Sequence, residues 1–201
     1  MVVLFVAADA SAQRQMKDFI KAMPDSLVPY LNITKRTELI DFYEMGVEAA
    51  TFNRLSENTV LDSLTANFAD LRLSERSRMQ LALLSLEGGD TLICMVRTYL
   101  GEEPESNVAF YDAAWHKQDA GTFLSVFDPM SLMVRPDTMS EERYEQLVRM
   151  VDPVMTSAVV DAKDQTLTFS LSTPMLRRAE REELKAILVQ RKFKWDGKKF
   201  N

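Results

Sequence analysis

The chain is poor in the residues that build the commonest catalytic and metal centres. Its 201 residues include one cysteine, Cys94, and one histidine, His116. A single cysteine excludes an intrachain disulfide. Zinc in its usual cysteine and histidine ligand sets needs more such residues than the chain contains. Six glycines and seven prolines are too few for flexible or proline-rich linkers.

Positive charge and long apolar runs are also scarce. The formal net charge is −6, so the chain is a poor candidate for binding nucleic acid, which needs clustered lysine and arginine. The C-terminal "RKFKWDGKK" is locally basic, and we interpret it as the solvated face of a hairpin. No apolar run approaches the roughly 20 residues that a helix needs to cross a bilayer. The sequence therefore predicts no membrane span.

The first residues have the pattern of an export signal. "VVLFVAA" at residues 2–8 is followed by Ala10, Ser11 and Ala12, which match the apolar middle and the small-residue cleavage site of a secretory signal. A basic start is absent, which favours a true start upstream of Met1. The alternative is a short buried strand, since an apolar run of this length also suits a core.

We expect residues 1–12 to be a signal remnant, cut before Gln13, and residues 13–201 to form one α+β domain. Such a product is soluble and either periplasmic or secreted. No cysteine lies near the cleavage site, so a lipid anchor there is not expected.

Two amphipathic helices are predicted after this segment. The first has apolar residues at helical spacing and ends near Pro24, and the second begins at Thr34 as its cap. Their expected buried residues are Met16, Phe19, Ile20 and Met23 in the first, and Leu39, Ile40, Tyr43 and Val47 in the second.

Four strands are predicted in the middle of the chain. They are "SLTANFADLRL", "SRMQLALLSL", "DTLICMVRTYL" and "SNVAFYDAAWHK". Short connections such as "EGGD" make consecutive strands antiparallel, because parallel pairing needs a long crossover. The third strand is apolar on both faces, so we expect it to be central and covered on both sides.

Two further helices and three strands are predicted in the last third. The segment "DTMSEERYEQLVRMVDP" predicts a helix with a capping box of Thr138 and Glu141. Its expected buried stripe is Tyr144, Leu147, Val148 and Val151. Residues 155–172 predict a hairpin whose second arm places Leu167, Phe169 and Leu171 inward, and Thr166, Thr168 and Ser170 outward.

The chain ends in a helix and a strand. Residues 173–188 predict a helix with Pro174 at its first position. Residues 189–200 predict a strand that buries Val189, Phe193 and Trp195 and then turns at Asp196-Gly197. The order of elements predicts an α+β fold: N-terminal helices, then an antiparallel sheet of about six or seven strands with further helices packed on it.

The candidate reactive residues give no catalytic, cofactor or metal site. Asp112 precedes His116 on the same face of one predicted strand, but four strand residues span roughly 13 Å, so a local dyad is not expected. Cys94 lies in an apolar run, where burial makes a thiol inert. Phosphate-binding glycine loops and a calcium loop of the D-x-D-x-D-G type are absent from the sequence.

Several segments together resemble a known family. "MKDFIKAMPDSLVPYL", "ELIDF", "LICMVRTYLGEEPES" and the terminal "KWDGKKF" are similar to a secreted family of anaerobic Gram-negative bacteria, catalogued as a domain of unknown function (DUF3256). The similarity runs over nearly all of residues 13–201. It implies an exported α+β protein of roughly 190 residues, and it provides no assigned catalytic residues to transfer.

Three functions are therefore weighed. We expect a non-catalytic binding module of the cell envelope whose partner is an envelope protein, a glycan or a small molecule, with no cofactor. The first alternative is an exported hydrolase that uses paired carboxylates, at least one with a raised pKa. The second is a carrier of an apolar molecule, with methionine and phenylalanine side chains around a hollow.

Overall fold

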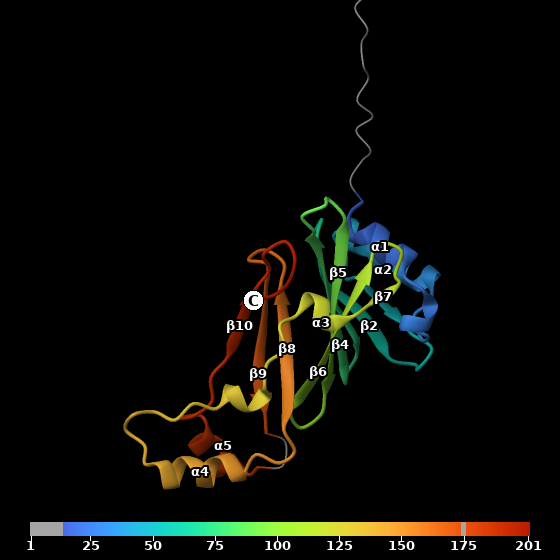
Figure 1. The fold of residues 1–201 in the computed structure, drawn as a ribbon. Helices are drawn as coiled ribbons and strands as arrows, with labels where there is room; N and C mark the ends of the chain where they lie inside the picture. Colours follow the sequence, from blue (N-terminus) through green and yellow to red (C-terminus); the bar gives the residue numbers. More distant parts are fainter. Residues whose placement is uncertain (1–13, 174–175) are drawn as a thin grey trace, which may run out of the picture.

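The described part of the chain forms two antiparallel sheets and five α-helices (Figure 1). The computed structural model describes residues 14–173 and 176–201, and the predicted signal segment lies outside them. The larger sheet has seven strands in chain order, which confirms the predicted antiparallel sheet and the α+β class. Its strands are β1 (Ala50–Phe52), β2 (Asn58–Leu64), β3 (Phe68–Ser74), β4 (Ser77–Ser85), β5 (Thr91–Leu100), β6 (Pro104–Asp112) and β7 (Lys117–Gln118).

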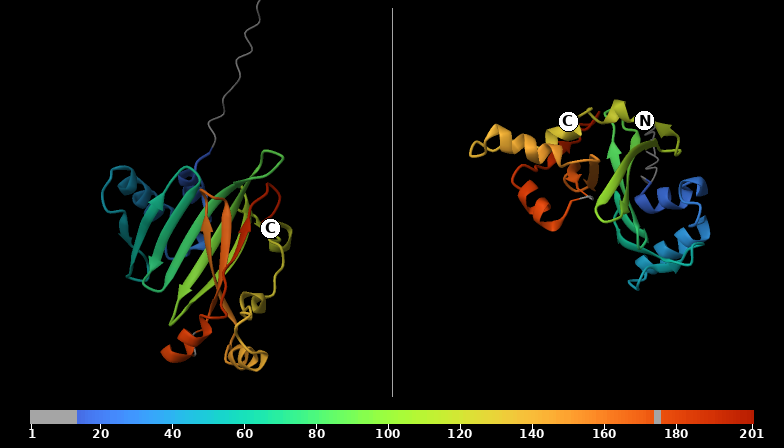
Figure 2. Two further views of the ribbon diagram at one scale, coloured as in Figure 1. Left: turned by 90° about the vertical axis from the view of Figure 1, so that its left-hand side faces the viewer. Right: turned by 90° about the horizontal axis from the view of Figure 1, so that it is seen from below.

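The last three strands form a separate sheet in the order β10-β9-β8. These are β8 (Met155–Asp161), β9 (Thr166–Ser172) and β10 (Arg191–Lys194). The smaller sheet packs on one face of the larger one, and helices α1 (Met16–Ala22) and α2 (Ile33–Glu44) cover the other face (Figure 2). A short helix, α3 (Ala120–Phe123), follows β7.

Strand β5 contributes to a different hydrophobic core on each face. Leu92, Cys94 and Val96 are buried against the smaller sheet. Ile93 and Met95 are buried in the cluster that contains the N-terminal helices. Because β5 pairs with both β4 and β6, it is central and covered on both sides, as its doubly apolar sequence predicts.

The predicted stripe of the first helix is confirmed, since Met16, Phe19, Ile20 and Met23 are all buried. The second helix differs from the prediction at both ends. It begins at Ile33, and the side chain of Asn32 caps it by accepting a hydrogen bond from the Lys35 amide. It ends at Glu44, so Val47 lies outside it and is 56% exposed.

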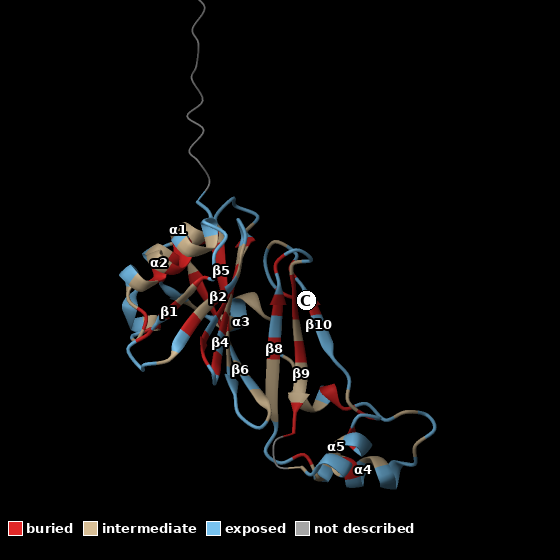
Figure 3. Ribbon diagram, turned by 180° about the vertical axis from the view of Figure 1, so that it is seen from behind, coloured by how far each residue is buried: buried red, intermediate tan, exposed pale blue. Residues whose placement is uncertain are grey.

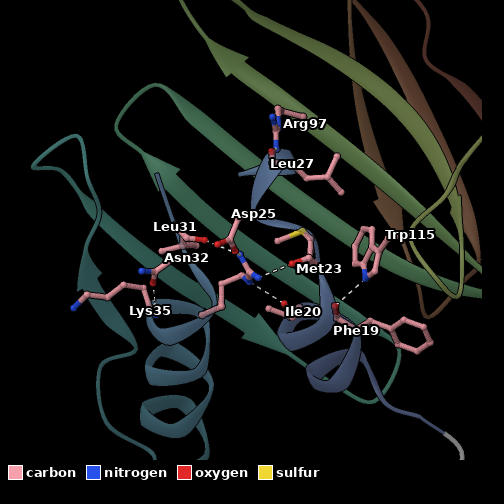
Figure 4. Close-up of polar contacts among 11 residues, drawn as sticks. Phe19, Ile20, Met23, Asp25, Leu27, Leu31, Asn32, Lys35, Arg97 and Trp115 are labelled. Atoms are coloured by element: carbon pink, nitrogen blue, oxygen red, sulfur yellow. Dashed lines mark hydrogen bonds and ion pairs between the residues drawn. The ribbon is translucent and has the colours of Figure 1, made fainter. Parts of the chain in front are cut away.

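A fully buried arginine holds the N-terminal helices together (Figure 4). The Arg36 guanidinium donates to the carbonyl oxygens of Ile20 (3.0 Å), Met23 (2.5 Å) and Leu31 (2.7 Å). It also pairs with the half-exposed Asp25 carboxylate at 2.8 Å. These carbonyls lie at the end of α1 and in the loop before α2, where helix ends leave backbone groups short of partners, and the Ile20 carbonyl also accepts the Met23 amide at 3.4 Å. The Arg36 side chain therefore holds the end of α1 and the loop before α2 in place.

Two side chains from the larger sheet and its turns also bond to α1 and the loop that follows it. The Trp115 indole nitrogen donates to the Phe19 carbonyl at 3.1 Å, and the Arg97 guanidinium donates to the Leu27 carbonyl at 2.7 Å. Figure 4 shows both contacts: Arg97 comes from β5, and Trp115 from the turn between β6 and β7. Directional bonds thus fix α1 and the following loop on the sheet, in addition to apolar packing.

Helices α4 (Glu141–Arg149) and α5 (Arg178–Leu184) pack around a third, smaller core away from the larger sheet (Figure 3). The predicted stripe of α4 is confirmed for Leu147, which is buried, and for Tyr144 and Val148, which pack against the same core. Val151 is buried as predicted but follows the helix, which ends at Arg149. The predicted capping box is wrong, because the chain enters the helix two residues later and Ser140 accepts the Arg143 amide.

The final helix also starts later than predicted. It begins at Arg178, with Arg177 as the cap residue, whereas Pro174 lies outside the described residues. Val189 is wrongly predicted as buried, because it precedes β10 and is 41% exposed. Phe193 and Trp195 are buried as predicted, and the turn at Asp196 is confirmed by a bridge between Trp195 and Phe200.

The hairpin of β8 and β9 is confirmed, with Asp161 opposite Thr166. Leu167 and Phe169 are buried, but so is Thr166, which the alternation places outward. Strand β1 and most of β2 are missing from the prediction. Their inward residues include Thr51 and Thr59, whose buried hydroxyls do not give the apolar alternation expected of a strand.

Replacing Arg36 with methionine tests its role. We expect Arg36→Met to lower the free energy of unfolding by about 3 kcal/mol, because three buried carbonyls lose their donors. Urea denaturation followed by circular dichroism measures this change. The control Asp25→Asn removes only the half-exposed partner, so it should cost less than about 1 kcal/mol. Equal effects of the two variants would contradict this account.

Candidate functional site

A groove begins where the two sheets meet and continues along the smaller sheet. It consists of three adjoining hollows with volumes of about 310, 710 and 620 Å³, and Gln165 lines all three. The first two hollows have residues of both sheets in their linings, and the third is lined by the smaller sheet and its β8–β9 turn. We call this the junction groove. Its lining residues are Arg14, Gln15, Thr65, Ala66, Asn67, Phe68, Leu83, Leu84, Ser85, Thr91, Val159, Val160, Asp161, Ala162, Lys163, Asp164, Gln165, Thr166, Lys192 and Lys194.

Two turns, one from each sheet, form the middle of the groove. Asn67 lies in the turn between β2 and β3 and accepts the Thr65 hydroxyl at 3.1 Å. Its side-chain nitrogen is 3.4 Å from the Ala162 carbonyl, in the turn between β8 and β9. The Asn67 carbonyl accepts the Leu83 amide at 2.8 Å. These contacts bring the β2–β3 turn next to the β8–β9 turn, although the two are far apart in the chain.

The turn between β8 and β9 is shaped by Asp161. Its carboxylate accepts the amides of Lys163 (2.8 Å) and Asp164 (3.0 Å), an arrangement in which an aspartate side chain mimics a backbone turn. The next residue, Gln165, has a φ of +53°. Glycine is the usual residue in this left-handed region, because a side chain raises its energy. The turn therefore carries a glutamine side chain at an energetic disadvantage.

Basic side chains cluster at the outer end of the groove. The third hollow is lined by Lys163, Lys192 and Lys194, together with Asp164. The Lys192 ammonium lies 3.9 Å from Asp164, and Asp161 is engaged with backbone amides. At the opposite end, Arg14 donates to the Ala113 carbonyl at 3.1 Å and lies over the Phe19 ring. The groove is thus locally positive on an acidic protein.

Side chains of the larger sheet occupy the edge of β8 that faces the larger sheet. The Gln80 side-chain oxygen accepts the Val160 amide at 3.3 Å, and the Ser106 hydroxyl is 3.4 Å from the Ala158 carbonyl. Gln80 also donates to Asp70, which Arg78 pairs with through two hydrogen bonds. The edge backbone groups at Ala158 and Val160 are therefore already hydrogen-bonded.

Asp112 and His116 form a pair that the sequence reading excludes. The His116 Nδ1 atom is 3.0 Å from Asp112 Oδ2. The prediction of one continuous strand is wrong here, because β6 ends at Asp112 and the chain turns back through Trp115, which has a φ of +67°. The turn converts an expected separation of roughly 13 Å into direct contact.

The Asp112 carboxylate is also the acceptor for its own turn. The amides of His116 and Ala114 each donate to it at 2.9 Å. The backbone hydrogen bond from His116, with smaller contributions from Ala114 and the imidazole, lowers the pKa of Asp112 below its ordinary 3.8. A hollow of about 280 Å³ beside the turn is lined by Asp112, Gln118 and Phe123, among others. The His116 side chain is 77% exposed.

The remaining reactive groups are placed as follows. Cys94 is fully buried, and burial raises the pKa of its thiol to about 12, so the thiolate is scarcely populated at neutral pH. Within residues 14–173 and 176–201, no group of three histidine, cysteine or acidic side chains is arranged to hold a metal ion. Where the pKa of a carboxyl group in this part of the chain clearly moves, it moves down: at Glu38, Glu44, Asp112, Glu180, Glu182 and Asp196.

Comparison with known proteins then places the chain in a family. The family model described as "Protein of unknown function (DUF3256)" matches residues 8–200. The chain belongs to the DUF3256 family. The predicted resemblance is thereby confirmed as to the family. A search of curated proteins finds no match.

A solved structure shares the fold. It is the structure of a domain of an uncharacterized protein from Porphyromonas gingivalis W83, with a TM-score of 0.75 and 17% sequence identity. The alignment covers 92% of this DUF3256 chain and 96% of that domain. At 17% identity, this similarity shows a shared fold.

None of the junction-groove residues was singled out as a site from the sequence. From the sequence, "DAKDQT" at residues 161–166 predicts only a hairpin turn. A signal was present in it, because the turn has no glycine where a left-handed residue is needed. The meeting of this turn with Asn67 depends on the packing of two sheets, which the local pattern does not encode.

The Asp112 contacts predict a specific pH dependence. Because the folded pKa is lowered, the stabilisation by Asp112 is present above pH 3.8 and is lost as the pH falls through the folded pKa. A carbon-detected NMR titration of the Asp112 carboxyl group should therefore give a midpoint below 3.8. Asp112→Asn should flatten the fall in stability over the same acidic range. A midpoint at or above 3.8 in the folded protein would show that these contacts do not hold in solution.

Proposed function

We propose that this DUF3256 protein is a non-catalytic binding module of the cell envelope and that its ligand occupies the junction groove. The ligand is polar and extended, because three hollows follow one another and amide, hydroxyl and charged side chains line them. Their volumes fall in the range of about 300–1,000 Å³ that small-molecule sites have in general.

The backbone of Gln165 is the observation that carries this proposal. A left-handed residue other than glycine is uncommon, and strained residues cluster at active sites and ligand clamps. Ser56 and Trp115 share this conformation but do not line the groove. Gln165 keeps a side chain at φ +53° and lines every hollow of the groove. Its carbonyl accepts the Trp195 amide at 2.8 Å, so the backbone bond supports the turn and would be available with glycine as well. The Gln165 side chain is not needed for this backbone bond and can contact a ligand.

The hydrolase alternative has less support. It needs a carboxyl group with a raised pKa, whereas the clear carboxyl shifts in the described residues are downward. The pair of Asp112 and His116 has the geometry of an oriented base. Among the contacts described for His116, its partners are Asp112 and Gln118, and neither is a nucleophile.

The carrier alternative needs apolar side chains around a hollow. Five methionines instead fill the cores: Met16, Met23, Met79, Met95 and Met133 are each at most 4% exposed, whereas Met45 is 64% exposed. The middle hollow has an apolar wall of Phe68, Val159, Val160 and Ala162, while amide, hydroxyl or charged side chains contribute to all three linings. The filled cores and the polar groups along the groove favour a binding groove over an apolar carrier.

The envelope location rests on the sequence pattern of residues 1–12. Among the described residues, none of the helices combines the length and the apolar character needed to cross a bilayer. We expect the protein isolated from its host to begin at Gln13 and to occur in the periplasmic fraction or the medium. Mass spectrometry of the native protein from separated fractions measures both. Recovery from the cytosol with residues 1–12 attached would contradict export.

Replacing Gln165 with glycine separates binding from folding. Gln165→Gly should change the free energy of unfolding by less than about 1 kcal/mol, because relief of the left-handed strain offsets the greater entropy of the unfolded chain. It should weaken binding at least about tenfold, since a polar contact to the ligand is lost. An array of bacterial envelope glycans identifies a ligand, and calorimetry with that ligand gives the dissociation constant.

The exposed Gln190 provides the matched control. Gln190→Gly makes the same substitution outside the junction groove, and its affinity should equal that of the unmodified protein. Failure of the array to yield any ligand, or full affinity in Gln165→Gly, would overturn the assignment of the groove.

A further inference from the structure

Resting on the proposed function, we propose a ligand class: the junction groove binds an acidic polysaccharide whose anionic groups contact Lys163, Lys192 and Lys194. The negative groups are carboxylates or sulfates, which present the same charge to an ammonium group. The sugar hydroxyls meet the amide and hydroxyl side chains of the neighbouring hollows.

Charge is the first support. The chain carries a net charge of −6, yet residues 189–201 hold five lysines and arginines and one aspartate, and Lys192 and Lys194 of this set line the groove together with Lys163. Lys192 and Lys194 are two residues apart in β10, so they emerge on one face about 7 Å from each other. Their pairing partners in β9 are Thr168 and Thr166. Positive charge therefore gathers at the groove, against the sign of the molecule.

The lysines are also free to bind. Among the described carboxylates, none comes within 4 Å of the ammonium groups of Lys163 or Lys194, and Lys192 has only the distant contact of 3.9 Å to Asp164. By contrast, Lys198 on the neighbouring turn pairs with Glu87 at 3.0 Å. An external anion would give the three groove lysines the partner that the fold does not supply.

The other lining residues favour a sugar over a nucleic acid. At the β8 edge they also disfavour a peptide, which would add to a free strand edge, because Gln80 and Ser106 already occupy that edge. Single-stranded nucleic acids need several aromatic platforms for base stacking, and Phe68 is the aromatic residue of the lining. Hydroxyl and amide groups, which match sugar hydroxyls, are instead present at Ser85, Thr91 and Gln165.

Calorimetry with defined polymers tests the ligand class on the full chain. The acidic probes are polygalacturonate, hyaluronate and dextran sulfate. Fully methyl-esterified polygalacturonate keeps the same sugar backbone without charge, and a thymidine oligonucleotide is an anionic polymer without sugar acids. We expect binding to at least one acidic polysaccharide and at least about tenfold weaker binding to the esterified polymer and to the oligonucleotide. Raising the salt concentration should weaken binding further, because it screens exposed charges.

Two charge-matched variants identify the site. Lys192→Gln combined with Lys194→Gln should weaken binding about tenfold or more. Lys117→Gln combined with Lys185→Gln removes the same charge from exposed positions outside the groove, and it should leave the affinity within about twofold. Circular dichroism checks that both variants keep the fold.

The outcomes separate this inference from the proposed function. Binding of a neutral envelope glycan that depends on Gln165, with none of the acidic probes bound, would overturn the ligand class and leave the groove intact. Equal loss in the two charge-matched variants, or equal affinity for the oligonucleotide, would show general attraction of polyanions and also overturn it. Absence of any glycan ligand would overturn the groove and the ligand class together.

Discussion

The structure depends on one strand that must be buried on both faces. Strand β5 presents Leu92, Cys94 and Val96 on one side and Ile93 and Met95 on the other. Leaving either set in water would forgo a favourable transfer of roughly 1.5–3 kcal/mol for each large side chain. Two covering layers are therefore required, and the chain supplies helices before the sheet and a second sheet after it.

The two layers are fastened in different ways, and the groove follows from the second. The helices are held by Arg36, by Arg97 and by Trp115, which donate hydrogen bonds to carbonyls of α1 and the following loop. The smaller sheet shares an apolar core with the larger one, and Gln80 and Ser106 also bond the backbone of β8. Beside that strand, the turn that holds Asn67 and the turn that holds Gln165 are in contact through Asn67 and Ala162, and a hollow lies between them. The junction groove is the space that this packing leaves.

The sequence predicted elements whose apolar period is clear and missed features that depend on turns. The stripe of α1 and the central place of β5 followed from spacing alone. Strand β1 and most of β2 were missed because Thr51 and Thr59 are buried, whereas a pattern of alternating apolar and polar residues predicts that threonines are exposed. The pair of Asp112 and His116 required a left-handed Trp115, and no pattern encodes that reversal. The groove forms only when the two sheets pack together. The sequence therefore predicts its turns separately and does not predict that they meet.

Hydrogen exchange at increasing, sub-denaturing urea tests most directly whether both layers depend on β5. Amides bonded within the core exchange only through global unfolding, whereas peripheral units open at lower free energy. We predict that the amides of Ile93 to Val96 exchange at the free energy of global unfolding, and those of α4 and α5 at a much lower one. Exchange of the β5 amides by a local opening, while β8 and β9 stay protected, would contradict the account.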